Sequence, residues 1–515
     1  MKSYDAVVIG AGLGGLSAAA RLARAGFSVR LLERHVQPGG YATTFFRDPF
    51  EFEVSLHELC DIGPPGRRGA LYRSLEELGV AERVEFLQLP TLYRTVAPGL
   101  DLRVPVGREP ALQALISAFP GERRGLRRLW DQLFGIVDEL RQLNARQGAA
   151  SAPHRVLSTL LRYPRLAHAA TVPLAAILDR ALEDPLARLA VTQLWTYFGL
   201  PPSQLSLLLF AGGLACYLET GAAYPVGKSQ RLSNAFVEVI EEAGGEVSLG
   251  CGAKRILCRA GRVVGVVTDH GEELATDAVV ANANPITTAF DLIGRDLVPE
   301  AFLHRLAAAR PSLSTVCVYL GLSKSSEELG LADHEVFVNH QVDVEKQYAS
   351  AFEAGLPDPV LVTAYNATDP AFSPPGTSVV ALTVLADGER WAAVPASQYP
   401  ELKRTLAERM ISRATELYPG LRDSIQVCVT STPVTNMRYT GNVGGAIYGF
   451  ANTPAENPAF RLDQRGPLEG LWFAGAWTRP GGGYAPCVAS GCAAAEAILT
   501  ERGAALPVAA RQGAR

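Results

Sequence analysis

A glycine-rich segment near the N-terminus could hold a phosphate group. It reads Gly10-Ala11-Gly12-Leu13-Gly14-Gly15 and follows an apolar run from Asp5 to Ile9. Gly10 permits a tight turn, Gly12 lets the backbone approach a pyrophosphate, and Gly15 lets a following helix pack closely on the strand. The free N–H groups and positive dipole at that helix N-terminus would then face the phosphates.

Glu33 stands at the end of the next apolar segment, where a carboxylate can accept hydrogen bonds from ribose hydroxyls. Strand, glycine turn, helix and acid together predict a dinucleotide site. Arg34 follows directly, and with the acid in place we expect it on the surface or beside the pyrophosphate. NAD remains an alternative from this motif alone.

Two further segments favour FAD over NAD. Pro38-Gly39-Gly40-Tyr41 follows Glu33 closely, and Leu471 to Tyr484 returns at the far end of the chain with Gly475-Ala476 and Gly481-Gly482-Gly483. Small residues at a helix N-terminus allow a second backbone approach, and the helix dipole can stabilise negative charge on a reduced flavin. We expect that helix to begin near Cys487. The predicted cofactor-binding residues are Gly10, Gly12, Leu13, Gly14, Gly15, Glu33, Arg34, Gly39, Gly40, Tyr41, Ile256, Gly475, Ala476, Gly482, Gly483, Tyr484 and Ala485.

Three side chains are candidates for catalysis. His57 and Glu58 follow an alternating stretch that we expect to be a strand leading into the cofactor cleft, where the histidine could accept a proton or polarise a substrate. A hydrogen-bonded structural histidine is the alternative. Lys228 could favour an anionic reduced flavin, or it could be a surface lysine on a turn. Tyr439, Tyr448 and Tyr484 could line the ring or the channel mouth.

The elements that must position these residues begin with a βαβ unit. Residues 16–25 form an alanine- and leucine-rich helix that ends at Gly26, and residues 28–33 supply the second strand. Residues 112–221 predict a mostly helical insertion. Strands are expected at 246–249, 263–268, 278–282, 312–322, 360–365 and 379–386.

Composition narrows the class of protein. The chain has 515 residues, a net charge of −4, 48% hydrophobic and 19% charged residues, so we expect several buried cores and no nucleic-acid partner. Its eight cysteines contain no CxxC pair, which argues against a metal site or a disulfide framework. With no signal peptide visible before the first strand, we expect a cytoplasmic protein.

One apolar stretch, residues 205–218, invites a membrane interpretation. It is too short to span a bilayer, which needs about 20 apolar residues. We expect a buried core helix or the wall of an apolar pocket. The alternative is a surface helix that dips into the inner face of the membrane and lets a lipid enter.

Several segments along nearly the whole chain carry a family resemblance. They are the N-terminal motif through Gly40, Tyr224-Pro225-Val226-Gly227, Gly244-Gly245-Glu246, Ala281 to Pro285, Gly444 to Gly449, and Ala474 to Gly491. With these the chain resembles the phytoene desaturase, carotenoid isomerase and retinol saturase family of FAD enzymes. It departs from the family at Gly227-Lys228-Ser229-Gln230. Around Phe52 to Cys60 it is closer to the saturase-like branch.

The resemblance implies an α/β fold with a Rossmann-like FAD-binding domain and an inserted substrate domain of sheet plus helices. We expect residues 1–105, 225–290 and 430–503 in the FAD-binding domain, residues 106–224 and 291–429 in the substrate domain, and a flexible tail at 504–515.

The implied function is desaturation of a polyene or isoprenoid lipid by hydride transfer to FAD. Redox-neutral isomerisation with reduced FAD and saturation are the alternatives among enzymes, and an inactive lipid-binding flavoprotein is the alternative outside them. An amine-oxidising flavoenzyme resembles the C-terminal segment less well.

Overall fold

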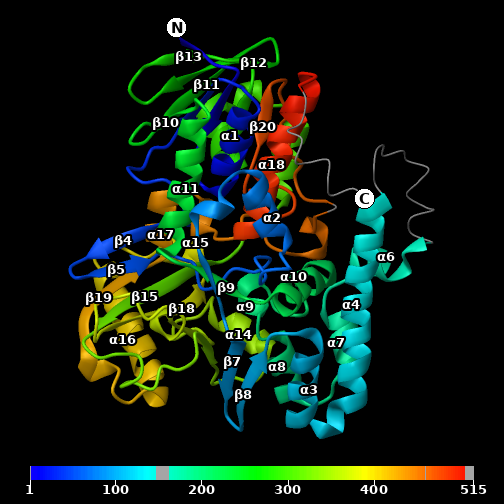
Figure 1. Cartoon of the computed structure of the whole chain (residues 1–515), viewed down its shortest axis with the longest axis vertical. Coiled ribbons are helices and arrows are strands. Elements are labelled where there is room, and N and C mark those ends of the chain that lie inside the picture. Colours follow the sequence, from blue (N-terminus) through cyan, green and yellow to red (C-terminus); the bar gives the residue numbers. More distant parts are fainter. Residues whose placement is uncertain (1, 147–161, 459, 505–515) are drawn as a thin grey trace.

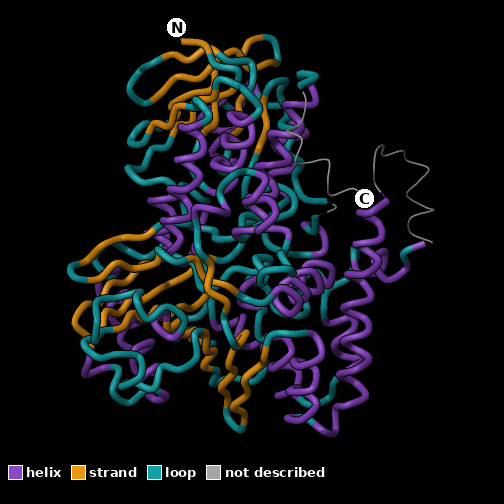
Figure 2. The backbone as a smooth tube through the Cα atoms, in the orientation of Figure 1, coloured by secondary structure: helices purple, strands orange, loops and turns teal. Residues whose placement is uncertain are grey.

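The computed structural model describes residues 2–146, 162–458 and 460–504. In Figure 1, a parallel sheet with its helices occupies the top of the molecule, and a second sheet and a group of helices lie below it. Figure 2 shows the same division, with strands gathered at the top and lower left and helices at the lower right. Most of the expected tail, residues 505–515, lies outside the described residues.

A five-stranded parallel sheet forms the first part, in the order β10-β3-β2-β14-β20. Its strands are β2 (Ala6–Ile9), β3 (Val29–Leu32), β10 (Glu246–Ser248), β14 (Val279–Ala281) and β20 (Leu471–Phe473). Side chains alternate along β2: Ala6 and Val8 join the core shared with the helices, whereas Val7 and Ile9 join a core on the opposite face. Strands from both ends of the chain therefore complete one sheet.

Different layers cover the two faces of this sheet. On one side α1 (Leu13–Arg24) packs against α11 (Lys228–Glu242) and α18 (Tyr484–Glu501), with α2 (Ala70–Glu77) against α18. On the other side lies a four-stranded sheet, in the order β1-β13-β12-β11. Its strands are β1 (Lys2–Ser3), β11 (Ala253–Arg259), β12 (Arg262–Thr268) and β13 (Glu273–Ala275). The α/β Rossmann-like architecture expected from the sequence is confirmed.

A seven-stranded mixed sheet organises the second part, in the order β19-β15-β18-β17-β16-β7-β8. The strands are β7 (Thr91–Ala97), β8 (Leu100–Pro105), β15 (Ser314–Leu322), β16 (Glu335–Val338), β17 (Val360–Ala364), β18 (Ser378–Ala386) and β19 (Ile425–Ser431). One face packs on α16 (Tyr399–Leu417) through residues such as Val316 and Met410. The other face carries Tyr319 and Leu361 toward the cavity described below.

The expected domain boundary at residue 105 is wrong. Residues 91–105 were assigned to the FAD-binding part, but β7 pairs in parallel with β16, so both β7 and β8 belong to the second sheet. The alternating pattern of residues 91–105 indicates two strands. It does not indicate which sheet they join, because the partner strand β16 lies more than 200 residues away in the sequence. Residues 91–105 therefore belong to the second sheet.

Helices fill the space beside the second sheet, and two small ribbons join the parts. The helices are α3 (Arg108–Ala118), α4 (Arg123–Arg146), α6 (Pro164–Ala169), α7 (Ala175–Ala181), α8 (Pro185–Thr192), α9 (Trp195–Phe198), α10 (Leu207–Thr220), α12 (Pro285–Thr287), α13 (Glu300–Ala308), α14 (Val344–Ser350), α15 (Gly388–Ala392) and α17 (Pro433–Thr440). The ribbons pair β4 (Thr44–Arg47) with β5 (Phe50–Glu53), and β6 (Phe86–Gln88) with β9 (Ala223–Pro225).

The apolar segment 205–218 is a buried core helix. No residue in this range is exposed, and Gly213 and Tyr217 of α10 line the cavity. This burial supports the core-helix interpretation, in which the segment forms part of the cavity wall. Among the described residues, no helix is both long and apolar enough to cross a bilayer.

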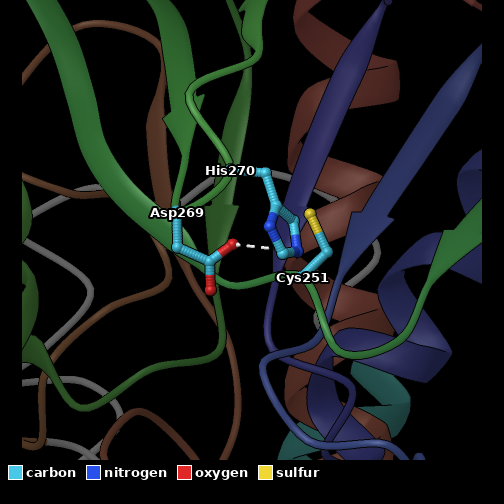
Figure 3. Close-up of side chains that lie close together, drawn as sticks. All are labelled: Cys251, Asp269 and His270. Atoms are coloured by element: carbon cyan, nitrogen blue, oxygen red, sulfur yellow. Dashed lines mark ion pairs between the residues drawn. The ribbon is translucent and has the colours of Figure 1, made fainter.

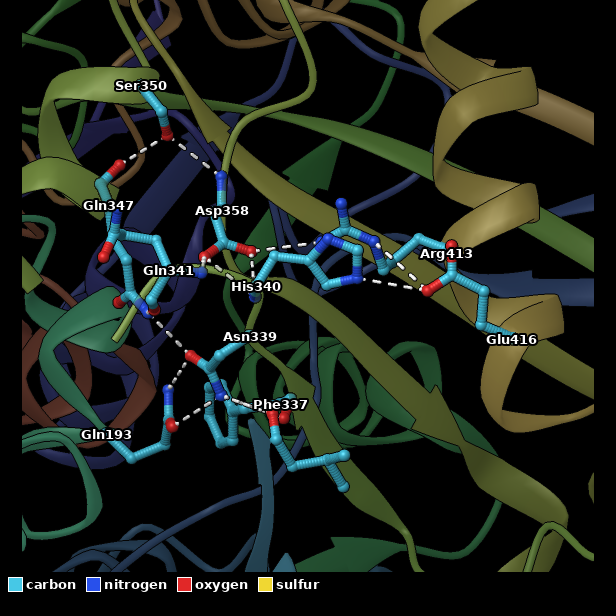
Figure 4. Close-up of polar contacts among 11 residues, drawn as sticks. Gln193, Phe337, Asn339, His340, Gln341, Gln347, Ser350, Asp358, Arg413 and Glu416 are labelled. Carbon is cyan, nitrogen blue, oxygen red and sulfur yellow. Dashed lines mark hydrogen bonds and ion pairs between the residues drawn. The ribbon is translucent and has the colours of Figure 1, made fainter. Parts of the chain in front are cut away.

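A buried polar network fastens the helices to the second sheet (Figure 4). The Asn339 amide donates to Gln193 Oε1 at 3.0 Å and accepts from Gln347 Nε2 at 2.9 Å. Gln347 also accepts from the Trp195 indole at 3.0 Å. These bonds join the segment between α8 and α9 to the end of β16 and to α14, and so hold α9 against the sheet.

Candidate active site

One cavity of about 1570 Å³ unites the two glycine segments with the second sheet. Of the residues predicted to bind the cofactor, all but Gly15 and Ile256 line it. Single ligand pockets usually measure about 300–1,000 Å³, so this cavity has room for a dinucleotide and a second molecule.

The N-terminal glycines fit a dinucleotide. A Cβ atom at Gly12 would stand 2.6 Å from Asn282 Nδ2, and one at Gly15 would overlap the Gly10 carbonyl oxygen. Gly15 therefore serves helix packing, as expected, and lies outside the cavity lining. The first turn of α1 carries no acidic residue, which leaves its positive end free for phosphate.

Glu33 is oriented by two backbone amides. Its Oε2 accepts from Ala11 N at 2.7 Å and its Oε1 accepts from His35 N at 2.8 Å. Each oxygen keeps a further lone pair for a ribose hydroxyl. The neighbouring Arg34 donates to the Tyr439 carbonyl at 2.8 Å and joins the first segment to the end of α17.

The C-terminal segment meets the same cavity at the start of α18. The helix begins at Tyr484, three residues before the predicted Cys487, and its N-cap Gly483 has φ +110°. Gly491 lies against Gly14, where a Cβ would overlap the Gly14 carbonyl. The Tyr484 hydroxyl donates to the Tyr41 carbonyl at 3.2 Å, so the second and third glycine segments are joined directly. Helices α1 and α18 therefore present both N-termini to one cavity.

Sequence reasoning misplaced one cofactor residue and missed others. Ile256 on β11 is 1% exposed and does not line the cavity; the lining residues of that segment are Gly252 and Ala253. The alternating pattern of a strand shows which residues share a face, but it does not show which residue of the strand borders a cavity. Asn282 touches Gly12, Gly14 and Gly475 and was noticed only as part of the Ala281 to Pro285 segment.

Lys228 is not placed for catalysis. Its side chain does not line the cavity; Nζ lies 3.1 Å from Glu51 Oε2 and 4.3 Å from the centre of the Phe372 ring. The residue is 8% exposed, so it is not a surface lysine either. It braces the β4–β5 ribbon from the N-terminus of α11.

His57 and Glu58 do line the cavity, on a segment that is less regular than predicted. Strand β5 ends at Glu53, and the carbonyls that follow accept hydrogen bonds from the second sheet. The donors are the Tyr319 hydroxyl to Val54 O, the Tyr365 hydroxyl to Leu56 O, and His334 Nε2 to His57 O, at 2.7, 3.0 and 2.8 Å. Leu59 also pairs with Ala223. These bonds fix the two side chains without a strand.

A chain of hydrogen bonds leads from His57 into the second sheet. His57 Nδ1 lies 2.6 Å from Thr363 Oγ1, which donates to Glu335 Oε2 at 2.8 Å. The Tyr197 hydroxyl donates to Glu335 Oε1 at 2.7 Å. Burial, with a smaller contribution from His334, lowers the pKa of His57 to about 3, so the imidazole is neutral.

Glu58 lies buried beside this chain without a partner of its own. It is 5% exposed, and neither carboxyl oxygen has a hydrogen bond to the described residues. Burial, then the Glu335 and Cys60 side chains, raise the pKa of Glu58 well above its usual range, against a smaller opposing effect of Tyr197. Burial also raises the pKa of Glu335 to about 8. Burial therefore favours the protonated form of both carboxyls.

A second cluster lies beside Gly252. The Cys251 thiol, an Asp269 oxygen and a His270 nitrogen fall within 4.8 Å of one another (Figure 3). Asp269 Oδ2 accepts from Gly252 N, and His270 Nε2 bonds to the Gly250 carbonyl, both at 2.9 Å. These two bonds brace the loop around Gly252.

Comparisons with known proteins agree with this geometry. The family model described as flavin containing amine oxidoreductase matches residues 13–499. The chain belongs to this family. Its cofactor is FAD, and it is an FAD-dependent oxidoreductase, as the motifs predicted.

Curated relatives of this flavin-dependent oxidoreductase match over most of their length. Prolycopene isomerase 1, chloroplastic, from an Oncidium hybrid cultivar is 24% identical, covering 98% of this chain and 85% of the relative. Human all-trans-retinol 13,14-reductase is 27% identical, covering 87% and 77%. The resemblance to carotenoid isomerases and retinol saturases is confirmed.

Solved structures share the fold of this oxidoreductase. An oxidoreductase from Methanosarcina mazei matches with a TM-score of 0.64 and 17% identity, covering 96% of this chain and all of its own. Putrescine oxidase with bound putrescine matches with a TM-score of 0.64 and 16% identity, covering 97% and 99%.

Proposed function

We propose that this oxidoreductase exchanges hydrogen with a conjugated isoprenoid lipid of the carotenoid or retinoid kind. The observation that carries the proposal is the single cavity that joins the cofactor cradle to an apolar chamber. The chamber walls are mainly aliphatic and aromatic: Leu56, Leu59, Tyr197, Phe198, Tyr217, Tyr319, Leu361, Leu385, Ile447 and Tyr448.

We expect one part of the chain to bind the cofactor and the other part to bind the substrate. Residues 1–90, 225–290 and 432–503 would hold FAD, and residues 91–224 and 291–431 would hold the substrate. Glu33 would bind the ribose, and the N-termini of α1 and α18 would face the pyrophosphate and the flavin. Bound there, FAD would supply two-electron hydride chemistry, while the protein orients the substrate and keeps water out.

An uncharged, apolar substrate fits the chamber better than a cationic one. The names of the curated relatives, prolycopene isomerase and all-trans-retinol reductase, specify conjugated polyenes. A cationic amine, as in putrescine oxidase, would be paired best by an ionised carboxylate, whereas burial favours the protonated form of Glu58. Oxidation of a small cationic amine is therefore the disfavoured alternative.

Two reactions exchange hydrogen with a polyene, namely dehydrogenation, which the sequence favoured, and saturation; isomerisation with reduced FAD, which leaves the hydrogen count unchanged, is the alternative. An anaerobic titration separates them. Oxidised and reduced holoenzyme are each mixed with carotenoids, retinoids and putrescine, while flavin absorbance and product mass are recorded.

Each outcome has a distinct meaning. Bleaching of the oxidised flavin with a product two hydrogens lighter means dehydrogenation. Recovery of oxidised flavin with a product two hydrogens heavier means saturation, and an unchanged mass from reduced enzyme alone means isomerisation. Reaction with putrescine but with no polyene would refute the proposal.

A further inference from the structure

Two polar atoms in the wall of the apolar chamber have no partner in the part of the chain that the structure describes. His57 bonds to Thr363 through Nδ1, which leaves Nε2 without a hydrogen bond to the described residues. The Tyr217 hydroxyl makes no hydrogen bond to them either. Both residues line the cavity. A polar atom in an apolar wall is costly unless a ligand or a water molecule bonds to it.

These two atoms can be reached from the cavity. Glu58 and Thr196 also carry polar atoms without a partner, but neighbouring atoms enclose those almost completely, whereas His57 Nε2 and the Tyr217 hydroxyl are not enclosed. The His57 side chain is 19% exposed, and Tyr217 is half-buried. Burial nevertheless lowers the pKa of His57 and raises that of Tyr217. Their accessible surface therefore faces the cavity and not bulk solvent.

His57 and Tyr217 lie in the same part of the chamber, although they come from different segments. His57 follows β5, Tyr217 belongs to α10, and both rings lie near Tyr197 of α9, with centroid distances of 6.2 and 5.9 Å. The Tyr197 hydroxyl is already bonded to the second sheet. Packing around one tyrosine thus brings two free hydrogen-bonding groups to one region of an otherwise apolar wall.

The charges around this region favour an uncharged partner. After burial, the largest effects on the pKa of Tyr217 come from Cys60, Glu58, Tyr448 and Glu335. None of these groups is a cation, and His57 is neutral because burial lowers its pKa to about 3. A neutral imidazole and a phenol can hydrogen-bond to an alcohol or a carbonyl oxygen. A carboxylate would find two carboxyl groups there and no positive charge to offset its lost hydration.

We propose that the substrate is an isoprenoid with an uncharged oxygen at one end, an alcohol or a carbonyl, and that His57 Nε2 and the Tyr217 hydroxyl bind this oxygen. The inference rests on the proposed function and narrows its substrate class, because an unsubstituted hydrocarbon leaves both polar atoms without a partner. Anchoring one end of the chain would determine which double bond reaches the flavin. The two residues would set specificity, and no bond of the end group would be made or broken.

The first test compares ligands that differ only in their end group. FAD-saturated wild type is titrated anaerobically with retinol, retinal, retinoate and the hydrocarbon of the same carbon skeleton, and flavin absorbance gives the dissociation constants. A carotene and its dihydroxy derivative form a second, longer pair. The alcohol or the aldehyde should bind at least about tenfold tighter than the hydrocarbon, which leaves two polar atoms unpaired, and retinoate should bind more weakly than either. Equal affinity for the hydrocarbon, or tightest binding of retinoate, would overturn the proposal.

The second test uses variants at full FAD occupancy. Tyr217→Phe removes one hydroxyl and keeps the ring, so affinity for the oxygenated ligand should fall about threefold to tenfold, while affinity for the hydrocarbon stays within twofold. His57→Phe should reduce the same preference. Tyr72→Phe on α2 removes a hydroxyl outside the cavity lining and should alter neither affinity. A merely structural role of Tyr217 would weaken both ligands of a pair equally, and that result would contradict the assignment.

The outcomes separate this inference from the proposed function. If Tyr217→Phe and His57→Phe both keep the wild-type preference for the oxygenated ligand, these residues do not bind the end group. If wild type reacts with the hydrocarbons and prefers them, the inference fails while hydrogen exchange with a polyene stands. If no polyene of either series changes the flavin spectrum or reacts, the proposed function itself fails.

Discussion

At the scale of single residues, the burial of Glu58 links protonation to stability. Its pKa in the folded chain is raised well above the ordinary value of 4.5, chiefly by burial. Between those two pH values the folded chain keeps a proton that the unfolded chain has released. Stability from this group is thus present below pH 4.5 and declines as pH rises toward the folded pKa.

Replacing Glu58 by glutamine removes this pH dependence. We expect the free energy of unfolding of Glu58→Gln, minus that of wild type, to be larger at pH 8 than at pH 5, because only wild type loses stability as pH rises. Urea denaturation of FAD-saturated protein at the two pH values measures the difference. The exposed control Glu353→Gln should track wild type at both, and a gap independent of pH would show that Glu58 titrates normally.

For Lys228 we expect an effect on stability and none on the reaction, because its contacts are structural. Lys228→Met removes the contact with Glu51 but leaves the cavity lining intact. We expect a loss of about 1–2 kcal/mol in the free energy of unfolding, since Glu51 is partly exposed. The flavin absorbance spectrum and the rate of hydride transfer should not change. A tenfold fall in rate with FAD still bound would restore the catalytic interpretation.

The sequence revealed those site residues whose role is local. Gly12 and Glu33 belong to one βαβ unit, so their spacing alone implies the dinucleotide cradle. Lys228 and Ile256 were misassigned because their positions depend on packing between distant segments. The partnership of Glu58 with Glu335 spans 277 residues and has no sequence motif, because only the pairing of the second sheet with the cavity wall creates it.

At the scale of elements, the contact between α1 and α18 closes the cofactor site. A Cβ at Gly491 would overlap both the Gly14 carbonyl and the Ser17 hydroxyl, and backbone cannot move aside as a flexible side chain can. Gly491→Ala should therefore cost about 1–3 kcal/mol of stability, as overpacking does, and weaken FAD binding at least about tenfold.

Gly212→Ala on α10 is the matched control for this helix contact. No atom lies within 4 Å of a Cβ there, so the change should be neutral or stabilise by about 0.5–1 kcal/mol. Flavin fluorescence titration and thermal unfolding measure both variants. Equal FAD affinity in the two would mean that α18 does not close the cofactor site.

The polar network around Asn339 makes a second element-scale prediction (Figure 4). Asn339→Ala leaves the amides of Gln193 and Gln347 short of a partner in a buried setting. We expect a loss of about 1–3 kcal/mol, measured by urea denaturation, with the exposed Asn144→Ala within 0.5 kcal/mol of wild type. A neutral Asn339→Ala would mean that α9 is held by its apolar contacts alone.

Most elements were predictable because their patterns are local. The predicted strands at 263–268, 360–365 and 379–386 correspond to β12, β17 and β18 within one residue at each end. The alternating stretch before His57 is a strand only as far as Glu53, and beyond it side-chain donors from the second sheet hold the backbone. The sheet membership of β7 and β8 depends on a pairing with β16, which no local pattern specifies.

At the scale of the whole molecule, the site lies where the FAD-binding part meets the second sheet. The parallel sheet supplies the glycine turns, and the second sheet supplies Thr363 and Glu335 behind His57. Neither part holds all the groups. The cofactor cradle and the substrate chamber should therefore respond separately to substitutions in the two parts.

Two adjacent glycines of α10 test this separation. A Cβ at Gly213 would stand 2.5 Å from Phe198 Cζ, so Gly213→Ala must displace an aromatic side chain of the chamber wall. We expect polyene affinity to weaken about tenfold, or about 1.4 kcal/mol, with FAD affinity unchanged. Gly212→Ala, one residue away and facing open space, should alter neither. Dissociation constants for both ligands come from flavin spectral titrations. If Gly213→Ala weakened FAD and left the polyene unaffected, the apolar chamber would not be the substrate site, because the wall that Phe198 forms would then belong to the cofactor.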